Sequence, residues 1–169
     1  FDVDDLAYEL LDGATLFHFG YPPAMRLIYE DGGERLMEIY KRAKSRCKLT
    51  SMDTALPDPQ SASGKADWNA ILKKSLPYVD IFLPSAEELL FMIRRDEYDH
   101  LMAKAEAGDI LPLITPELLV ALANHLHGLG VKIVVIKLGY RGLFVHCASK
   151  GMMEDLAAVL PINVDAWAN

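Results

Sequence analysis

The sequence has little cysteine, no long apolar run and no excess of positive charge. Its 169 residues include 2 cysteines, Cys47 and Cys147, too few for a disulfide scaffold and not in the C-x-x-C spacing typical of zinc sites. We therefore expect a reducing, cytoplasmic setting. Clean apolar stretches such as Ile133–Ile136 are far shorter than the ~20 residues that cross a bilayer, which argues against a membrane protein.

The charge balance argues against a general nucleic-acid binder. Lys and Arg number 17 against 24 Asp and Glu, a formal net charge of −7, whereas proteins that bind nucleic acid non-specifically carry a positive surface. A hydrophobic content of 51% and a charged content of 24% are typical of a folded globular protein. We expect residues 1–169 to form a single domain.

Neither terminus looks like a natural chain end. Phe1 is not an initiator Met, and residues 1–5 have neither the basic region nor the apolar core of a signal peptide. Residues 165–169 contain no Gly or Pro that would end a helix. We expect both ends to be boundaries of a fragment or of the ordered part of a longer chain.

Short apolar segments alternate with helical patterns along the chain. The predicted strands are Ala14–Phe19, Lys48–Met52, Val79–Leu83, Val131–Lys137 and Leu143–Cys147. Helices are predicted between them, at Glu34–Arg46, Trp68–Leu76, Ser85–Ile93 and Thr115–Gly128. The unbroken apolar run Ile133–Ile136 is typical of a strand covered on both faces. The short link between the last two strands predicts a hairpin, so the fold class is α/β, with a mostly parallel, mixed sheet and helices on both faces.

Three segments where a strand ends carry polar residues. Ser85-Ala86-Glu87-Glu88 opens a helix directly after a strand, where α/β proteins bind ligands. A capping box of Ser85 and Glu88 explains this segment without any function, but a carboxylate here could also orient water around a magnesium-bound phosphate. Asp53 follows another strand, either as a site residue or as a loop cap.

The third segment contains two glycines. This segment is Lys137-Leu138-Gly139-Tyr140-Arg141-Gly142. Its glycines, Gly139 and Gly142, either let the backbone approach a phosphate or simply form a tight hairpin. Tyr21, beside a Pro-Pro turn after the first strand, is a candidate substrate contact, with packing as the alternative.

Two other patterns can be excluded as sites. Ser63-Gly64-Lys65-Ala66 resembles the end of a P-loop, but Pro59 stands where that motif needs a glycine. His125 and His127 are two positions apart on a predicted helix, so they point in different directions and cannot chelate one metal from the same face. We expect them to form a surface pair.

The order and spacing of three segments resemble the pattern of the ribokinase-like (phosphofructokinase-B) carbohydrate kinases. These segments are Asp53, Leu83–Leu90 and Val134–Gly142. Ser85–Glu88 is similar to that family's N-x-x-E motif, which arranges magnesium and phosphate, with Ser85 in place of the Asn. Lys137–Gly142 is similar to its T-x-G-x-x-G nucleotide motif, with Lys137 in place of the Thr. The resemblance covers about Gly13 to Cys147. It implies an incomplete ribokinase-like core that lacks the family's N-terminal lid portion and its C-terminal G-A-G-D segment, which carries the catalytic base.

The resemblance implies an enzyme, a sugar kinase that transfers the γ-phosphoryl group of ATP to a hydroxyl of a small sugar or nucleoside with Mg²⁺. By resemblance, Lys137, Gly139 and Gly142 would bind nucleotide, Glu88 would serve the metal, and Asp53 and Tyr21 would contact substrate. No catalytic residue is assigned, because the family's base has no counterpart here, so the fragment itself is expected to be inactive.

Alternative interpretations remain open. A non-catalytic kinase-like domain that binds nucleotide or sugar is favoured slightly by the substitutions at Ser85 and Lys137. An unrelated Rossmann-type enzyme is disfavoured, because no G-x-G-x-x-G follows the first predicted strand. The expected partner is the small-molecule substrate, without nucleic acid or membrane, and a homodimer is one option for the assembly.

Overall fold

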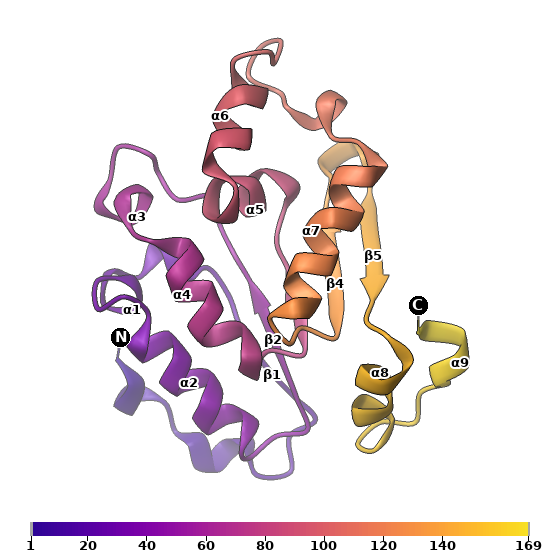
Figure 1. The fold of residues 1–169 in the computed structure, drawn as a ribbon. Coiled ribbons are helices and arrows are strands. Elements are labelled where there is room, and N and C mark those ends of the chain that lie inside the picture. The colour runs from indigo at the N-terminus through magenta and orange to yellow at the C-terminus, as the bar shows by residue number, and fades with distance from the viewer. Residues whose placement is uncertain (1, 169) are drawn as a thin grey trace.

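The computed structural model describes residues 2–168, whose centre is a five-stranded sheet (Figure 1). The strands lie side by side in chain order: β1 (Leu16–Phe19), β2 (Leu49–Asp53), β3 (Ile81–Leu83), β4 (Ile133–Lys137) and β5 (Leu143–Cys147). β1 to β4 are parallel, and β5 runs antiparallel to β4. The predicted strands and the mixed sheet are therefore confirmed, with ends that differ by up to two residues.

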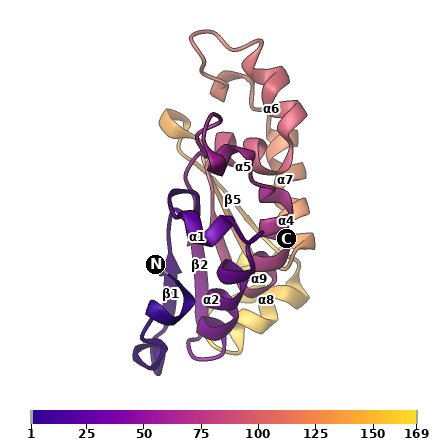
Figure 2. The ribbon, with the colours of Figure 1, turned by 90° about the vertical axis from the view of Figure 1, so that its left-hand side faces the viewer.

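The helices that connect the parallel strands cover one face of the sheet (Figures 1 and 2). Each of the strands β1 to β3 is followed by its next neighbour in the same direction, and right-handed crossovers then place the connecting helices on the same side. These helices are α1 (Arg26–Tyr29), α2 (Glu34–Lys44), α3 (Ala62–Lys65), α4 (Trp68–Ser75), α5 (Ala86–Ile93), α6 (Arg95–Met102) and α7 (Pro116–Gly128). Within residues 2–168, no helix has the length and apolar character needed to span a membrane.

The main core lies between this helical layer and the sheet. Met52, Phe82 and Val134 are fully buried in the three central strands. The apolar face predicted for α2 supplies the opposite side of the core, where Tyr40 is also fully buried. The Tyr40 hydroxyl donates a hydrogen bond of 2.9 Å to the Ser51 carbonyl, so the polar end of this buried ring is satisfied.

Within residues 2–168, the second face is covered only where the parallel strands begin. There α8 (Lys150–Ala157) and α9 (Val164–Trp167) follow β5, and the side chains of α8 pack against Leu49 and Ile133. On β5, Leu143 and Val145 remain 64% and 51% exposed. The prediction of helices on both faces is confirmed, with unequal layers. The expectation that the Ile133–Ile136 run is covered on both sides is wrong in part, because residues 133 and 135 are only half-buried.

Candidate functional site

Three segments meet at the carboxyl end of the sheet, where the parallel strands stop. Asp53 is the last residue of β2 and Lys137 the last of β4, while Ser85 follows β3 and caps α5. The backbone N–H of Lys137 donates 2.9 Å to the Pro84 carbonyl, which fixes the end of β4 beside the start of α5. Because parallel strands finish at the same end, their following residues face a common space, as in other open α/β sheets.

A mixed-charge cluster occupies this space, formed by Asp53, Thr54, Glu88 and Lys137 and called the Lys137 cluster below. The Lys137 ammonium lies 2.5 Å from Asp53 Oδ1 and 3.9 Å from Glu88 Oε2. The Thr54 hydroxyl donates 2.7 Å to the same Glu88 oxygen. Exposed side-chain fractions are 35% for Lys137, 21% for Asp53 and 12% for Glu88. The structure therefore brings together three of the residues predicted as site residues.

Glu88 is held by the start of its own helix. The Ser85 hydroxyl accepts a hydrogen bond of 3.1 Å from the Glu88 N–H, and the Ser85 N–H donates 2.8 Å to Glu88 Oε2. This reciprocal pair is the capping box that the sequence predicts as the functionless interpretation of Ser85-Ala86-Glu87-Glu88. The box also fixes the Glu88 carboxylate in the Lys137 cluster, so the structural and functional interpretations are compatible.

The two glycines after β4 have backbone conformations that side chains disfavour. Gly139 has φ +53° and Gly142 has φ +88°, in the left-handed region that glycine enters at low cost. The Leu138 N–H donates 2.8 Å to the Gly142 carbonyl and closes the turn into β5. The hairpin interpretation is confirmed, and the phosphate contact of Gly139 and Gly142 stays a prediction.

Tyr21 lies next to the cluster through its backbone. Its N–H donates 3.2 Å to the carbonyl of Asp53, and its φ of 57° is unusual for a side-chain-bearing residue. The Tyr21 residue is 55% exposed, which disagrees with the packing role given as its alternative. The substrate contacts of Tyr21 and Asp53 stay predictions.

Thr54 is the member of the cluster that sequence reasoning missed. It is fully buried, and its hydroxyl bridges the loop after β2 to Glu88 on α5. A usable signal was present in its position directly after Asp53, since polar residues that follow a strand lie at the ligand-binding end of the sheet.

The carboxylates of the cluster do not fit a resident magnesium ion in this arrangement. Mg²⁺ in phosphate-binding sites is held by one or two carboxylates together with waters and substrate oxygens. Here Asp53 Oδ1 and Glu88 Oε2 are already approached by the Lys137 ammonium. Among residues 2–168, no group of three or more His, Cys, Asp or Glu side chains could hold a metal ion. The geometry gives no support to the metal role predicted for Glu88.

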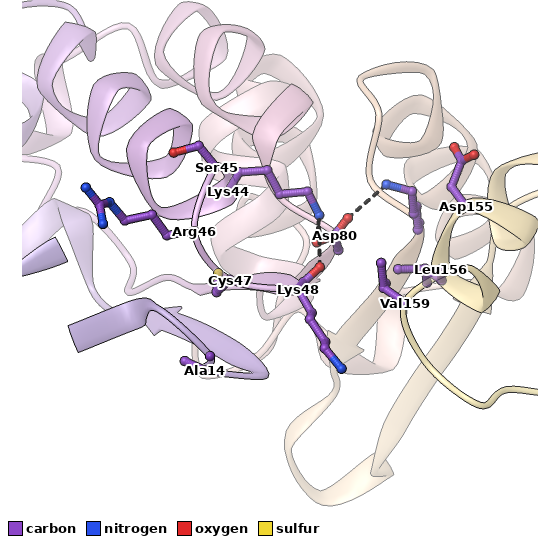
Figure 3. A pocket seen from close by; sticks show the side chains of 12 residues that line it. Ala14, Lys44, Ser45, Arg46, Cys47, Lys48, Asp80, Asp155, Leu156 and Val159 are labelled. Carbon is purple, nitrogen blue, oxygen red and sulfur yellow. Dashed lines mark hydrogen bonds and ion pairs between the residues drawn. The ribbon is translucent and has the colours of Figure 1, made fainter. Parts of the chain in front are cut away.

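A cavity of about 570 Å³ lies at the opposite, amino end of the sheet (Figure 3). Its centre is Asp80, whose carboxylate forms ion pairs with Lys44 and Lys132. Burial raises the pKa of Asp80, but hydrogen bonds from Lys132, Lys44 and the Thr50 backbone outweigh it and leave the pKa below its ordinary value. Arg46 points away from Asp80 (Figure 3). The Asp80 carboxylate is buried and both of its oxygens are engaged by these partners, which indicates a structural role for this side chain.

His127 corrects the expectation of a surface histidine pair. His125 is exposed, but His127 is half-buried, with its Nδ1 2.7 Å from the Val131 carbonyl and its Nε2 2.9 Å from Nδ1 of His146. Burial, and next the nearby His127, lower the pKa of His146. The pairing was hidden because His146 belongs to β5, which the fold places beside α7.

Comparisons with known proteins find similarity at the level of structure. No family model matches the chain, and no curated protein matches its sequence. A sugar kinase from Clostridium perfringens is 17% identical with a TM-score of 0.49, over 86% of this chain and 35% of that one. A PfkB protein from a Polaromonas species is 22% identical with a TM-score of 0.49, over 97% and 53% of the two chains.

A ribokinase from Thermotoga maritima is also similar, with 15% identity and a TM-score of 0.47, over 97% of this chain and 50% of that one. The chain aligns with only part of each of these structures. It spans about 35% to 53% of their lengths.

Proposed function

We propose that this chain is the nucleotide-binding part of a phosphotransferase that transfers the γ-phosphoryl group of ATP to a hydroxyl of a small sugar or nucleoside. The observation that carries the proposal is the position of the Lys137 ammonium, which lies at the carboxyl end of the sheet just before the positive-φ turn of Gly139 and Gly142. An ammonium group and an open glycine backbone are both complementary to phosphate oxygens.

The substrate hydroxyl would approach from the side of Asp53 and Tyr21. The Asp53 carboxylate is partly exposed, and the backbone N–H of the half-exposed Tyr21 donates a hydrogen bond to the backbone carbonyl of Asp53. A carboxylate can accept hydrogen bonds from the hydroxyls of a sugar or nucleoside, and a phenol can both accept and donate them. Both residues lie beside the proposed phosphate position, so donor and acceptor would meet above the end of β2.

We expect this chain to bind nucleotide without catalysing phosphoryl transfer. Phosphoryl transfer needs a base for the attacking hydroxyl and donors for the charge of the transferred group. In the family that the sequence resembles, both come from a G-A-G-D segment, and residues 1–169 contain no such sequence. The 169-residue chain should therefore bind nucleotide weakly without phosphorylating a substrate. The cytoplasmic setting and the homodimer stay predictions.

A second candidate function is a binding domain without catalysis in the whole protein. The observation that favours it is the Lys137–Asp53 ion pair of 2.5 Å, which engages a carboxylate that a kinase would leave for its substrate. The capping role of Ser85, which provides no side-chain amide, favours the same candidate.

The two candidates are distinguished by activity assays on two proteins. The purified chain and the longest available parent protein are incubated with ATP, Mg²⁺ and a panel of sugars and nucleosides, and ADP binding is measured by calorimetry. We expect millimolar ADP binding by the chain, about −4 kcal/mol, and turnover by the parent alone. Turnover by the chain equal to that of the parent would contradict the proposal, and an inactive parent that still binds ADP would favour the second candidate.

A further inference from the structure

The position between the two carboxylates of the Lys137 cluster is already filled by a positive charge. Lys137 Nζ lies 2.5 Å from Asp53 Oδ1 and 3.9 Å from Glu88 Oε2. A magnesium ion on the same oxygens would need contacts of about 2.0–2.1 Å. It would then lie against the ammonium group, and two cations in contact repel each other strongly in a partly buried site.

The backbone keeps the Lys137 side chain at this position. Lys137 ends β4, and its N–H is bonded to the Pro84 carbonyl. On the other side, the Thr54 hydroxyl and the Ser85 N–H both donate to Glu88 Oε2, so the carboxylate cannot turn toward an added ion without losing these hydrogen bonds. The arrangement is therefore built around one lysine rather than around an exchangeable ion.

The ammonium group can still receive a ligand. It carries three N–H donors, of which the Asp53 carboxylate takes one at 2.5 Å. The Lys137 side chain is 35% exposed, so an anion can reach the remaining donors from solvent. The positive-φ turn at Gly139 begins two residues later, at the same end of the sheet.

We infer that Lys137 serves as a covalently attached cation in place of a divalent metal ion, so that this site excludes metal and binds phosphate through the lysine itself. The exclusion of metal follows from the ion pairs alone. The binding of phosphate rests on the proposed function, and its chemical class is the diphosphate of a nucleotide. The inference differs from the magnesium-dependent chemistry that the sequence resemblance implies.

The exclusion of metal is tested with Mn²⁺ alone, without nucleotide. Mn²⁺ is titrated into the wild-type chain and into Lys137→Met, while broadening of the amide signals of Asp53, Thr54 and Glu88 is followed by NMR. We expect Lys137→Met to bind Mn²⁺ here at least about tenfold more tightly, because one positive charge is removed within 4 Å of the carboxylates. Equal affinity of the two proteins, or tight binding by the wild type, would overturn the inference.

Three further variants make this result specific. Lys137→Arg keeps the charge and should bind Mn²⁺ as weakly as the wild type, and the Lys137→Met/Glu88→Gln double variant should lose the gain. Lys150→Met removes a lysine outside the Lys137 cluster, one that pairs with Asp165. This variant should leave Mn²⁺ binding at Glu88 unchanged. If circular dichroism shows that Lys137→Met does not fold, Lys137→Gln replaces it. A gain in Mn²⁺ affinity in Lys137→Arg as large as that in Lys137→Met would contradict the charge argument.

The phosphate part is tested by ADP binding in EDTA and in Mg²⁺. The wild-type affinities should agree within about twofold, because the cation is part of the chain. ADP binding that disappears in EDTA would overturn the inference. An absence of ADP binding in both buffers would instead contradict the proposed function, whereas the Mn²⁺ result would still decide whether Lys137 excludes metal.

Discussion

Asp80, the residue before β3, keeps its carboxylate almost out of contact with solvent, with 2% of the side chain exposed. Its oxygens accept hydrogen bonds from Lys44, from Lys132 and from the Thr50 N–H. Breaking such a pair from one side leaves charges without a partner, which costs more than the pair itself contributes. Asp80 thereby ties α2, β2 and the start of β4 together at the amino end of the sheet.

Replacing Asp80 by Asn should lower the free energy of unfolding by about 3 kcal/mol at neutral pH. Since hydrogen bonds hold the pKa of Asp80 below its ordinary value in the folded state, the charged form stabilises the fold. This stabilisation is complete above the unfolded-state pKa of about 3.9 and is lost as the pH falls through the lower folded-state pKa.

Urea unfolding of wild type and Asp80→Asn at pH 7 and at pH 3 measures this difference, which should shrink on acidification. Asp99→Asn is the matched control, because Asp99 forms an exposed ion pair with Arg95 on one helix and should cost less than about 0.5 kcal/mol. A difference that is the same at both pH values would show that the Asp80 charge does not stabilise the fold.

Residue-level contacts across the sheet were beyond the sequence. Lys137 and Asp53 are separated by 84 positions, and only the direction in which each side chain leaves its strand brings them together. The sequence did indicate that Asp53, Glu88 and Gly139 each lie where a predicted strand ends. Because the carboxyl ends of parallel strands share one end of a sheet, these residues were expected at the same end. That rule places residues at an end but does not pair them.

At the scale of elements, Gly64 explains how the segment that resembles a P-loop can pack as it does in α3. Ser63-Gly64-Lys65 lies in α3, whose first turn is capped by Ser61. A Cβ added at Gly64 would lie 2.6 Å from the Pro59 Cα and would also meet the backbone of Asp58. The glycine therefore serves a close backbone approach, in agreement with the exclusion of a P-loop.

Gly64→Ala should lower the free energy of unfolding by about 2 kcal/mol, since backbone must move to admit the methyl group. Gly128→Ala is the matched control, because a Cβ at this α7 residue meets nothing within 4 Å, and it should be neutral or raise stability by about 0.5 kcal/mol. Thermal and urea unfolding measure both. Equal stability of the two variants would contradict the close-approach argument.

Elements with strong periodic patterns were the ones that the sequence predicted well. The apolar face of α2 and the buried β3 and β4 are bounded by turn residues and lie within two residues of their predicted ends. The helix α8 was not predicted, because Lys150–Ala157 contains a glycine and has only two buried residues, Met153 and Leu156. Its helical state depends on packing against the sheet, and the residue pattern of the segment alone does not reveal this packing.

At the scale of the whole molecule, the two faces of the sheet differ in cover. One face carries the connecting helices, whereas the other carries α8 and α9 only where the parallel strands begin. The sequence predicted cover on both faces but not this inequality, because right-handed crossovers in sequential strand order place the helices on one side. The chemistry-bearing residues converge at the carboxyl end, opposite the cavity around Asp80.

The proposed function depends on the binding of a nucleotide at the carboxyl end of the sheet, on Lys137. The most direct measurement is an ADP titration of the isotope-labelled chain, followed through its backbone amide signals by NMR. We expect shifts concentrated at residues 53–54, 85–88 and 137–142, with none around Asp80. These shifts should be lost in Lys137→Met but not in Lys150→Met. Shifts confined to the cavity around Asp80, or unchanged in Lys137→Met, would contradict it.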